Sequence, residues 1–192
     1  MCGILGVVSD KIDERDFSSS LDTLNHRGPD NKSLINLKDL ILGHTRLSII
    51  DVDKRSNQPF QMDQYTIIFN GEIFNFIELR QELINFGIEF KTNSDTEVLL
   101  AAYHYWGKNF LSRLNGMWAF AIYDKSKNEI FLSRDRYGIK PLYFCKIGKE
   151  FLFASEIKAI LPLINKRYVS KEEIIRFLIY GAQEHRKETM FC

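Results

Sequence analysis

The sequence predicts an α+β fold, because a part that mixes helices with short strands precedes a part made almost entirely of strands. After Gly116, apolar and aromatic runs separated by polar breaks occupy residues 117–123, 129–133, 142–145 and 151–154. This pattern is typical of an antiparallel sheet, and residues 124–128 are predicted to form a hairpin loop within it. Strands and helices do not alternate regularly, so a repeated βαβ unit is not expected.

The remaining elements follow from hydrophobic spacing and from residues that begin or end helices. Short strands are predicted at residues 4–8, 40–42 and 66–69, and a helix is predicted at residues 16–25. Two further helices begin at Asn75 and Ser94, each of which precedes a glutamate by three positions, and they end at Gly87 and Gly107. Ser170 is predicted to cap a last helix that ends near residue 180.

The composition excludes several classes of function. The 192 residues suffice for one domain, and 26 basic against 25 acidic residues give a net charge of +1, which does not indicate binding to nucleic acid or an anionic membrane. We expect no membrane span, because the apolar runs are too short, and no secretion signal, because the N-terminus has no charged region followed by an apolar one. Three widely spaced cysteines, Cys2, Cys145 and Cys192, fit a reducing environment, so a cytoplasmic location is expected.

The histidines give no indication of a metal site. His26, His44, His104 and His185 lack the spacing of metal ligands, and no cluster of cysteines or carboxylates accompanies them in the sequence. No metal-binding residues are therefore expected. The aromatic residues within 118–153 are expected to form core, and not a stacking platform for bases.

Cys2 directly follows the initiator methionine, which makes it a candidate nucleophile. Removal of Met1 would leave a first residue that carries both a thiol and a free α-amine. The thiolate is a strong nucleophile, and the neighbouring amine can accept its proton, directly or through one water molecule. The alternative is an ordinary small buried cysteine, which the position alone does not exclude.

Eight segments strengthen the first interpretation. They are MCGI (1–4), HRGPD (26–30), GHTRLSIID (43–51), NQPF (57–60), FNGEIFN (69–75), SDTE (94–97), SRDRYGIKPLY (133–143) and ASEIKA (154–159). In this order they resemble the N-terminal glutaminase domain of glutamine-hydrolysing asparagine synthetases, which are class II (N-terminal nucleophile) glutamine amidotransferases. The resemblance covers nearly the whole chain. The phosphoribosyl-pyrophosphate and glucosamine-phosphate amidotransferases of this class fit less well around Arg46.

The resemblance implies both a fold and a reaction. The fold is a four-layer αββα sandwich, in which two antiparallel sheets stack between helical layers. In the reaction, Cys2 attacks the side-chain amide of L-glutamine, glutamate and ammonia are released, and a synthetase domain or partner receives the ammonia. The HRGPD segment and residues 135–138 are expected to frame the site and support the sheet.

The resemblance also assigns roles to individual residues. Catalysis is assigned to Cys2, Asn70 and Gly71, and glutamine binding to Arg46, Leu47, Ser48, Ile49, Ile50, Asn70, Gly71, Glu72 and Asp95. Asn70 and Gly71 would donate to the developing oxyanion, although Asn-Gly is also a strong hairpin-turn signal. Arg46 would bind the α-carboxylate through its planar fork, and Glu72 and Asp95 the α-ammonium.

Alternative interpretations of the two charged residues are open at this point. Arg46 is also compatible with a surface salt bridge, and Asp95 with a favourable charge at the start of a helix. A catalytically silent domain that acts as a binding or scaffold partner is the alternative for the whole chain.

Asparagine synthetases of this type continue into an ATP-dependent domain with a Ser-Gly-Gly motif, which this sequence lacks. We therefore expect a glutaminase domain over residues 1–165 and a C-terminal helix and connection over residues 166–192. No cofactor is expected in this domain, since ATP and Mg²⁺ would serve only the synthetase domain. The ammonia acceptor, aspartate or another carboxylate, is not encoded here. Apolar surface left uncovered would favour a partner or a homodimer.

Overall fold

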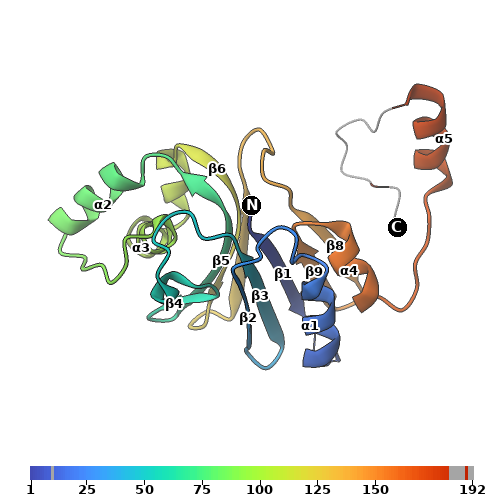
Figure 1. The fold of residues 1–192 in the computed structure, drawn as a ribbon, viewed down its shortest axis with the longest axis horizontal. Helices are drawn as coiled ribbons and strands as arrows, with labels where there is room; N and C mark the ends of the chain where they lie inside the picture. Colours follow the sequence, from blue (N-terminus) through green and yellow to red (C-terminus); the bar gives the residue numbers. More distant parts are fainter. Residues whose placement is uncertain (10, 182–188, 190–192) are drawn as a thin grey trace.

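The computed structural model describes residues 1–9, 11–181 and 189, which form two antiparallel sheets. Helices cover the outer face of each sheet, so Figure 1 shows helices, sheet, sheet and helices from left to right. The predicted α+β fold with an αββα arrangement is thus confirmed.

One sheet has five strands in the order β2-β3-β1-β9-β8. Its strands are β1 (Gly3–Val8), β2 (Asn31–Asn36), β3 (Leu40–Arg46), β8 (Tyr143–Ile147) and β9 (Glu150–Ala154). The central strand β1 pairs with β3 on one side and β9 on the other. Cys2 directly precedes this central strand, which fixes its place at one end of the sheet.

The other sheet has four strands in the order β4-β5-β6-β7. They are β4 (Phe60–Met62), β5 (Tyr65–Ile73), β6 (Gly116–Asp124) and β7 (Glu129–Arg134). β6 pairs with the whole of β5, whereas β4 pairs with β5 only as far as Ile67. The second half of β5 therefore has a free edge on the β4 side.

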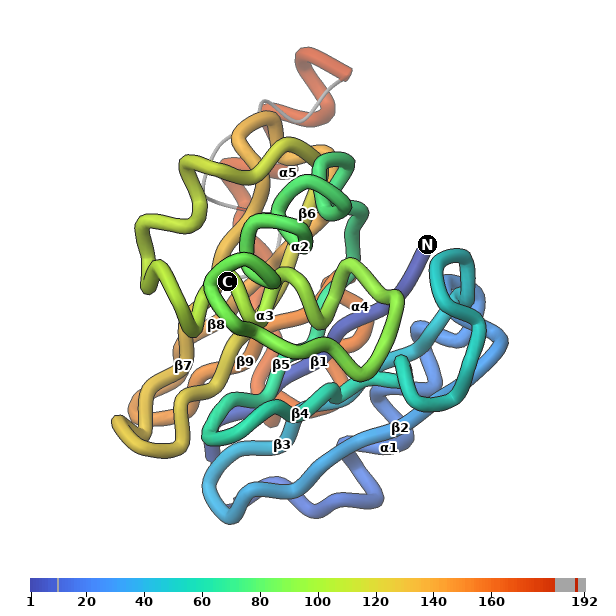
Figure 2. The backbone as a smooth tube through the Cα atoms, turned by 90° about the vertical axis from the view of Figure 1, so that its left-hand side faces the viewer, coloured from blue at the N-terminus to red at the C-terminus, as the bar shows by residue number. Residues whose placement is uncertain are grey.

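Three apolar layers hold the sandwich together. α2 (Phe76–Asn85) and α3 (Asp95–Trp106) pack on the four-stranded sheet, in front of it in Figure 2. α1 (Glu14–Asp22) and α4 (Ile157–Ile160) pack on the five-stranded sheet. Between the sheets lie Ile4, Leu42, Ile68 and Phe153, among others. Short 3-10 helices occupy Lys54–Ser56, Gly107–Arg113 and Leu161–Leu163.

Every predicted strand is present within a residue or two, except that two strands are much longer than expected, and two further strands were not predicted. The strands predicted at 40–42 and 66–69 are Leu40–Arg46 and Tyr65–Ile73, because pairing with neighbouring strands overrides the weak strand preference of their glycine and polar residues. The edge strand β2 escaped prediction because it is largely polar, and β4 because it has only three residues.

Two helices begin at the predicted capping residues, and a third begins earlier than predicted. The helix predicted at 16–25 begins earlier, at Glu14, because the side chain of Asp13 accepts a hydrogen bond from the backbone N of Arg15 at 2.6 Å. The side chains of Ser94 and Ser170 accept backbone hydrogen bonds at the starts of α3 and of α5 (Lys171–Tyr180), as predicted.

The capping role predicted for Asn75 was wrong. Its side chain donates to the carbonyl of Arg113 and accepts from the backbone N of Asn115, so it ties α2 to the segment before β6. Glu97 likewise does not complete a capping box, since its carboxylate accepts from the backbone N of Thr92 at 2.7 Å. Asn75 is thus taken up by contacts that are distant in the sequence, and Glu97 by the backbone just before its own helix.

The helices α2 and α3 end near the glycines predicted to stop them. Gly87 and Gly107, with φ of 88° and 57°, follow the last turns of α2 and α3. The predicted loop at 124–128 connects β6 and β7, where the carboxylate of Asp124 accepts from the backbone N of Ser126 and Asn128 has φ of 52°.

The predicted last helix is α5, which stands apart from the sandwich in Figure 1 and buries none of its residues. His185 and Cys192 lie outside the described residues. Within the described part of the chain, no helix is long and apolar enough to cross a membrane.

Candidate active site

A pocket lies where the start of β1 meets the end of β3 and the second half of β5. Its volume is about 250 Å³, which suits a small ligand. It is lined by Met1, Cys2, Arg46, Leu47, Ile49, Ile50, Ser56, Gln58, Phe69, Asn70, Gly71, Glu72, Ser94, Asp95, Thr96, Met117 and Lys140. All predicted site residues except Ser48 belong to this lining. Ser48 lies beside it, and its backbone N donates to the carboxylate of Asp30 at 2.7 Å.

Cys2 is half-buried in the pocket wall. The backbone N of Leu47 donates to its sulfur at 3.4 Å, and the thiol donates to the carbonyl of Leu47 at 3.7 Å. Burial raises the pKa of the Cys2 thiol, although the N–H of Leu47, the terminal amine and Arg46 each act to lower it. The protonated thiol is therefore the resting form at neutral pH, and nucleophilic attack requires a base.

Arg27 fixes the backbone at Cys2. Its Nε donates to the carbonyl of Cys2 at 2.9 Å, and its Nη1 donates to the carboxylate of Glu156 at 2.8 Å. Burial alone would raise the pKa of Glu156, but hydrogen bonds from Arg27, Lys158 and His26 outweigh it and hold the pKa at about 2. The HRGPD segment thus supports the site, as expected.

Asn70 and Gly71 lie inside β5, opposite Ala119 and Trp118, so their interpretation as a hairpin turn is wrong. The side chain of Asn70 is buried, and its Nδ2 has no hydrogen-bond partner among the described residues. A buried amide without a partner costs about 1–3 kcal/mol. In a pocket, such a group can donate a hydrogen bond to a bound molecule.

The N–H of Gly71 faces the free edge of β5. Alternate residues of a strand direct their N–H groups to the same side, and the N–H groups of Phe69 and Ile73 both donate to side chains beyond this edge. Gly71 lies midway between them, where the pocket is. A β-carbon at this position would overlap the carbonyl oxygen of Met117, so the packing requires glycine.

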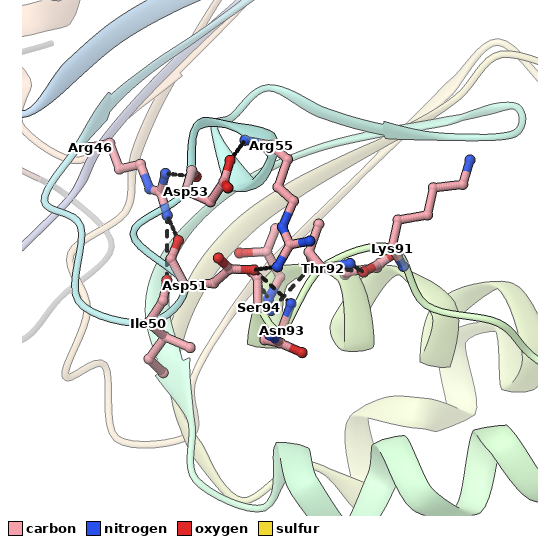
Figure 3. Close-up of polar contacts among 11 residues, drawn as sticks. Arg46, Ile50, Asp51, Asp53, Arg55, Lys91, Thr92, Asn93 and Ser94 are labelled. Atoms are coloured by element: carbon pink, nitrogen blue, oxygen red, sulfur yellow. Dashed lines mark hydrogen bonds and ion pairs between the residues drawn. The ribbon is translucent and has the colours of Figure 1, made fainter.

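Arg46, the last residue of β3, holds the loop that follows it. Its buried guanidinium donates to the carbonyls of Ile50, Asp51 and Asp53 (Figure 3) and to the side chain of Asn57. The alternative of a surface salt bridge is wrong, since these partners are neutral groups. To bind a carboxylate in a bidentate manner, Arg46 would need guanidinium N–H groups that already donate to the loop. The carboxylate-binding role therefore stays a prediction.

Asp51 connects this loop to the segment before α3. Its carboxylate accepts from the backbone N of Asn93 at 2.6 Å and lies 3.5 Å from the guanidinium of Arg55 (Figure 3). Burial would raise the pKa of Asp51, but these groups hold it below its ordinary value. Because the carbonyl of the same residue binds Arg46, Asp51 links Arg46 to the helix start that carries Asp95.

Asp95 and Glu72 supply the negative charge of the pocket. Burial raises the pKa of Asp95 to about 6, and the charge of Glu72 adds to this, against the N–H groups of Ile73 and Thr96. Asp95 also lies in the first turn of α3, so a favourable interaction with the helix dipole accompanies its place in the pocket.

Gln58 and Lys140, two polar residues of the lining, were not predicted as site residues. Both side chains are buried, and both belong to segments singled out above, NQPF and SRDRYGIKPLY. Membership of these segments was the available signal. Asp135 supports the sheet as expected, since its carboxylate accepts backbone hydrogen bonds from Trp118, Tyr137, Ile139 and Lys140.

The pocket combines a thiol, an amide without a described partner, a backbone N–H at a free strand edge, a guanidinium and two carboxylates. This set suits nucleophilic attack on a carbonyl group of a small ligand that carries both charges. Among the described residues, no group of three or more histidines, cysteines or carboxylates is placed to hold a metal ion.

Comparison with known proteins agrees with this chemistry. A family model described as a glutamine amidotransferase domain matches residues 1–192. Glutamine-hydrolysing asparagine synthetase 3 of Bacillus subtilis (strain 168) is 43% identical over 169 residues, which cover 84% of this chain and 27% of that protein. A putative glutamine-hydrolysing asparagine synthetase 2 of Methanocaldococcus jannaschii is 36% identical over 206 residues, which cover 94% and 39%. The chain thus spans well under half the length of these relatives.

Among solved structures, the glutamine phosphoribosylpyrophosphate amidotransferase from B. subtilis superimposes with a TM-score of 0.74. The match covers 84% of this chain and 43% of that chain at 24% identity, which shows a shared fold. The family match over the whole chain, the relatives in sequence and the fold lead to the same assignment. The chain belongs to the glutamine amidotransferase domain family, of the class II (N-terminal nucleophile) type.

Proposed function

We propose that this domain hydrolyses L-glutamine to glutamate and ammonia through a thioester on Cys2, and supplies the ammonia for amide synthesis of the asparagine synthetase type. One observation carries the proposal. The buried Nδ2 of Asn70, which has no partner among the described residues, lies in the same pocket as the Cys2 thiol. A fixed donor of this kind stabilises the negative charge that develops on a carbonyl oxygen under attack.

The reaction begins when the sulfur of Cys2 attacks the side-chain carbonyl carbon of glutamine. The C–S bond forms, the thiol proton passes to the α-amine, and the carbonyl oxygen becomes an oxyanion that accepts from Asn70 Nδ2 and Gly71 N–H. Collapse breaks the C–N bond, and ammonia leaves with the proton that the amine returns. Water then attacks the thioester, releases glutamate and restores the thiol.

The base in this scheme is the α-amine of Cys2, which becomes free only after removal of Met1. Met1 is 55% exposed, so an aminopeptidase can reach it. Because burial raises the pKa of the thiol, the amine is needed to generate the thiolate. A catalytic thiol also needs reducing surroundings, and we propose the cytoplasm as the location.

The charges of the pocket match both ends of free glutamine. In the proposal, Arg46 attracts the α-carboxylate, the backbone of residues 47–50 lies beside it, and Asp95 and Glu72 accept the α-ammonium. Since the guanidinium already holds the loop, Arg46 acts both through its charge and by fixing the backbone that contacts the substrate.

Affinity for glutamine is expected to fall as the pH decreases through the pKa of Asp95, which is about 6. Only the ionised carboxylate pairs with the ammonium, so the dissociation constant should rise about tenfold per pH unit below that value and stay constant above it. Glutamine itself does not titrate in this range. Isothermal titration calorimetry on the Cys2→Ala variant measures binding without turnover.

The matched control is Cys2→Ala combined with Asp95→Asn, which should bind weakly and without this pH dependence. A dissociation constant for the Cys2→Ala variant that is equal at about pH 5 and about pH 7 would rule out the ammonium-binding role of Asp95.

Intact mass spectrometry tests the proposed reaction. The purified chain is incubated with diazo-oxo-norleucine, an electrophile that mimics glutamine. We expect loss of Met1 and one covalent adduct on Cys2. A retained Met1, or a processed chain without an adduct, would contradict the glutaminase proposal and favour the silent binding domain.

Use of the ammonia requires a second unit. In the proposal, a synthetase domain or partner with ATP and Mg²⁺ amidates aspartate or another carboxylate, while the glutaminase reaction itself needs no cofactor. Residues 1–165 form the glutaminase domain and residues 166–192 the helix and connection towards that unit. The apolar side chains exposed on α5 suit contact with such a partner or with a second copy in a homodimer.

A further inference from the structure

We propose that His44 and Gln58 are positioning residues that hold the strand segment carrying the oxyanion donors Asn70 and Gly71. Both side chains bind the backbone of Phe69, the residue before Asn70, at the free edge of β5. The inference rests on the proposed glutamine hydrolysis and adds two residues that act through this strand.

The pairing of β5 explains why such support is needed. β6 pairs with the whole strand, but β4 leaves it after Ile67. On that side, the backbone N–H and carbonyl of Phe69 have no strand partner, although Phe69 is only 2% exposed. Buried backbone groups require hydrogen-bond partners, so side chains from other segments take the place of the missing strand.

His44 satisfies the carbonyl of Phe69. It is fully buried on β3 of the other sheet, and its Nε2 lies 3.1 Å from that oxygen. Because a carbonyl oxygen only accepts, Nε2 carries a proton. Burial and the nearby charge of Arg46 lower the pKa of His44 to about 3, so the ring is neutral. This hydrogen bond joins the five-stranded sheet, whose central strand follows Cys2, to β5, which carries Asn70.

Gln58 satisfies the N–H of Phe69. Its Oε1 accepts from the Phe69 backbone N at 2.6 Å, and its Nε2 donates to the hydroxyl of Thr96 at 3.1 Å. The backbone carbonyl of Gln58 accepts from the hydroxyl of Ser33 on β2. The buried amide therefore connects β5 to the helix α3 and, through its backbone, to the five-stranded sheet.

The two contacts fix the peptide unit that leads into Asn70. Oxyanion stabilisation depends on donors that are in place before the reaction, so a small displacement of this peptide weakens the transition-state contact. Of the groups proposed to bind the two charges of glutamine, Arg46 lies on β3 and Asp95 on α3, and only Glu72 shares β5 with the oxyanion donors. Loss of the His44 contact should therefore slow the chemical step more than it weakens binding.

Replacing His44 with leucine removes the donor at a similar side-chain volume. In a steady-state ammonia-release assay, kcat of His44→Leu is expected to fall about tenfold or more, while KM for glutamine changes by less than about threefold. His44→Gln places an amide near the position of Nε2 and should recover most of the lost kcat.

Leu42→Ala is the matched control. Leu42 lies two residues earlier on the same strand, is fully buried and belongs to the layer between the sheets. This variant should lower Tm by opening a cavity and leave kcat within about twofold of the wild-type value. Equal losses of kcat in Leu42→Ala and His44→Leu would overturn the inference. A His44→Gln variant no faster than His44→Leu would do the same.

A second measurement does not depend on turnover. NMR of protein labelled with ¹⁵N-histidine reports the tautomer of each ring, and the His44→Gln variant identifies the signals of His44. We expect a neutral ring protonated at Nε2 at neutral pH. A ring protonated at Nδ1, or a charged ring, would overturn the inference even in an inactive chain. The wild-type assay thus judges the proposed function, and the tautomer judges the role of His44.

Discussion

Replacing Cys2 with alanine is expected to abolish glutamine hydrolysis and to leave the fold intact. The sulfur is the group proposed to form the thioester, and loss of the nucleophile in a covalent mechanism lowers kcat by about 10⁴-fold or more. Among the described residues, the thiol hydrogen-bonds to the backbone N and O of Leu47 and to no other group, and Cys2 precedes the first strand. The free energy of unfolding should therefore change by about 1 kcal/mol or less. Ammonia release and thermal denaturation measure the two effects.

The control for this experiment is Cys145→Ala. Cys145 is the other free cysteine of the described residues, is half-buried on β8 and does not line the pocket. This variant should keep both the activity and the diazo-oxo-norleucine adduct. Near-normal hydrolysis by Cys2→Ala would disprove the assignment of the nucleophile, and an equal loss in both variants would point to a general effect on the protein.

The layered fold was predictable because hydrophobic patterning is strong where strands are central. Residues 117–123 and 151–154 gave β6 and β9, both buried and paired on two sides. Prediction failed where long-range pairing decides the structure. Asn70 and Gly71 favour a turn locally, yet β6 holds both in an extended strand.

Most residues of the candidate site were also predictable, although hydrophobic patterning did not identify them. Its residues came from the resemblance, and the structure brings all of them except Ser48 into one pocket lining. The roles of His44 and Arg46 in holding backbone groups were not predictable. His44 belongs to the GHTRLSIID segment and has no metal-ligand spacing, but nothing in its local sequence reveals that the second sheet places a carbonyl oxygen beside it.

Replacing Asn70 with alanine is expected to lower kcat about 10²- to 10³-fold with little change in KM, since a lost oxyanion donor costs about 3–4 kcal/mol of barrier. Replacing a buried asparagine ordinarily lowers stability, because its hydrogen bonds are lost, but Asn70 should behave differently. Because Nδ2 has no partner among the described residues, removal of the amide relieves an unsatisfied group, and Tm should stay the same or rise. Steady-state kinetics and thermal denaturation on the same samples measure both effects.

Asn75→Ala provides the contrast. Asn75 follows the same segment of β5, but its amide makes two hydrogen bonds, to the backbone of Arg113 and Asn115, and it does not line the pocket. Its replacement should cost about 1 kcal/mol of stability and leave kcat unchanged. If Asn70→Ala lost stability and kept its kcat, Asn70 would be a structural residue. If Asn70→Ala instead lowered kcat and left Tm undiminished, the amide of Asn70 would act in the transition state. There, the developing oxyanion would be the hydrogen-bond partner that it lacks among the described residues.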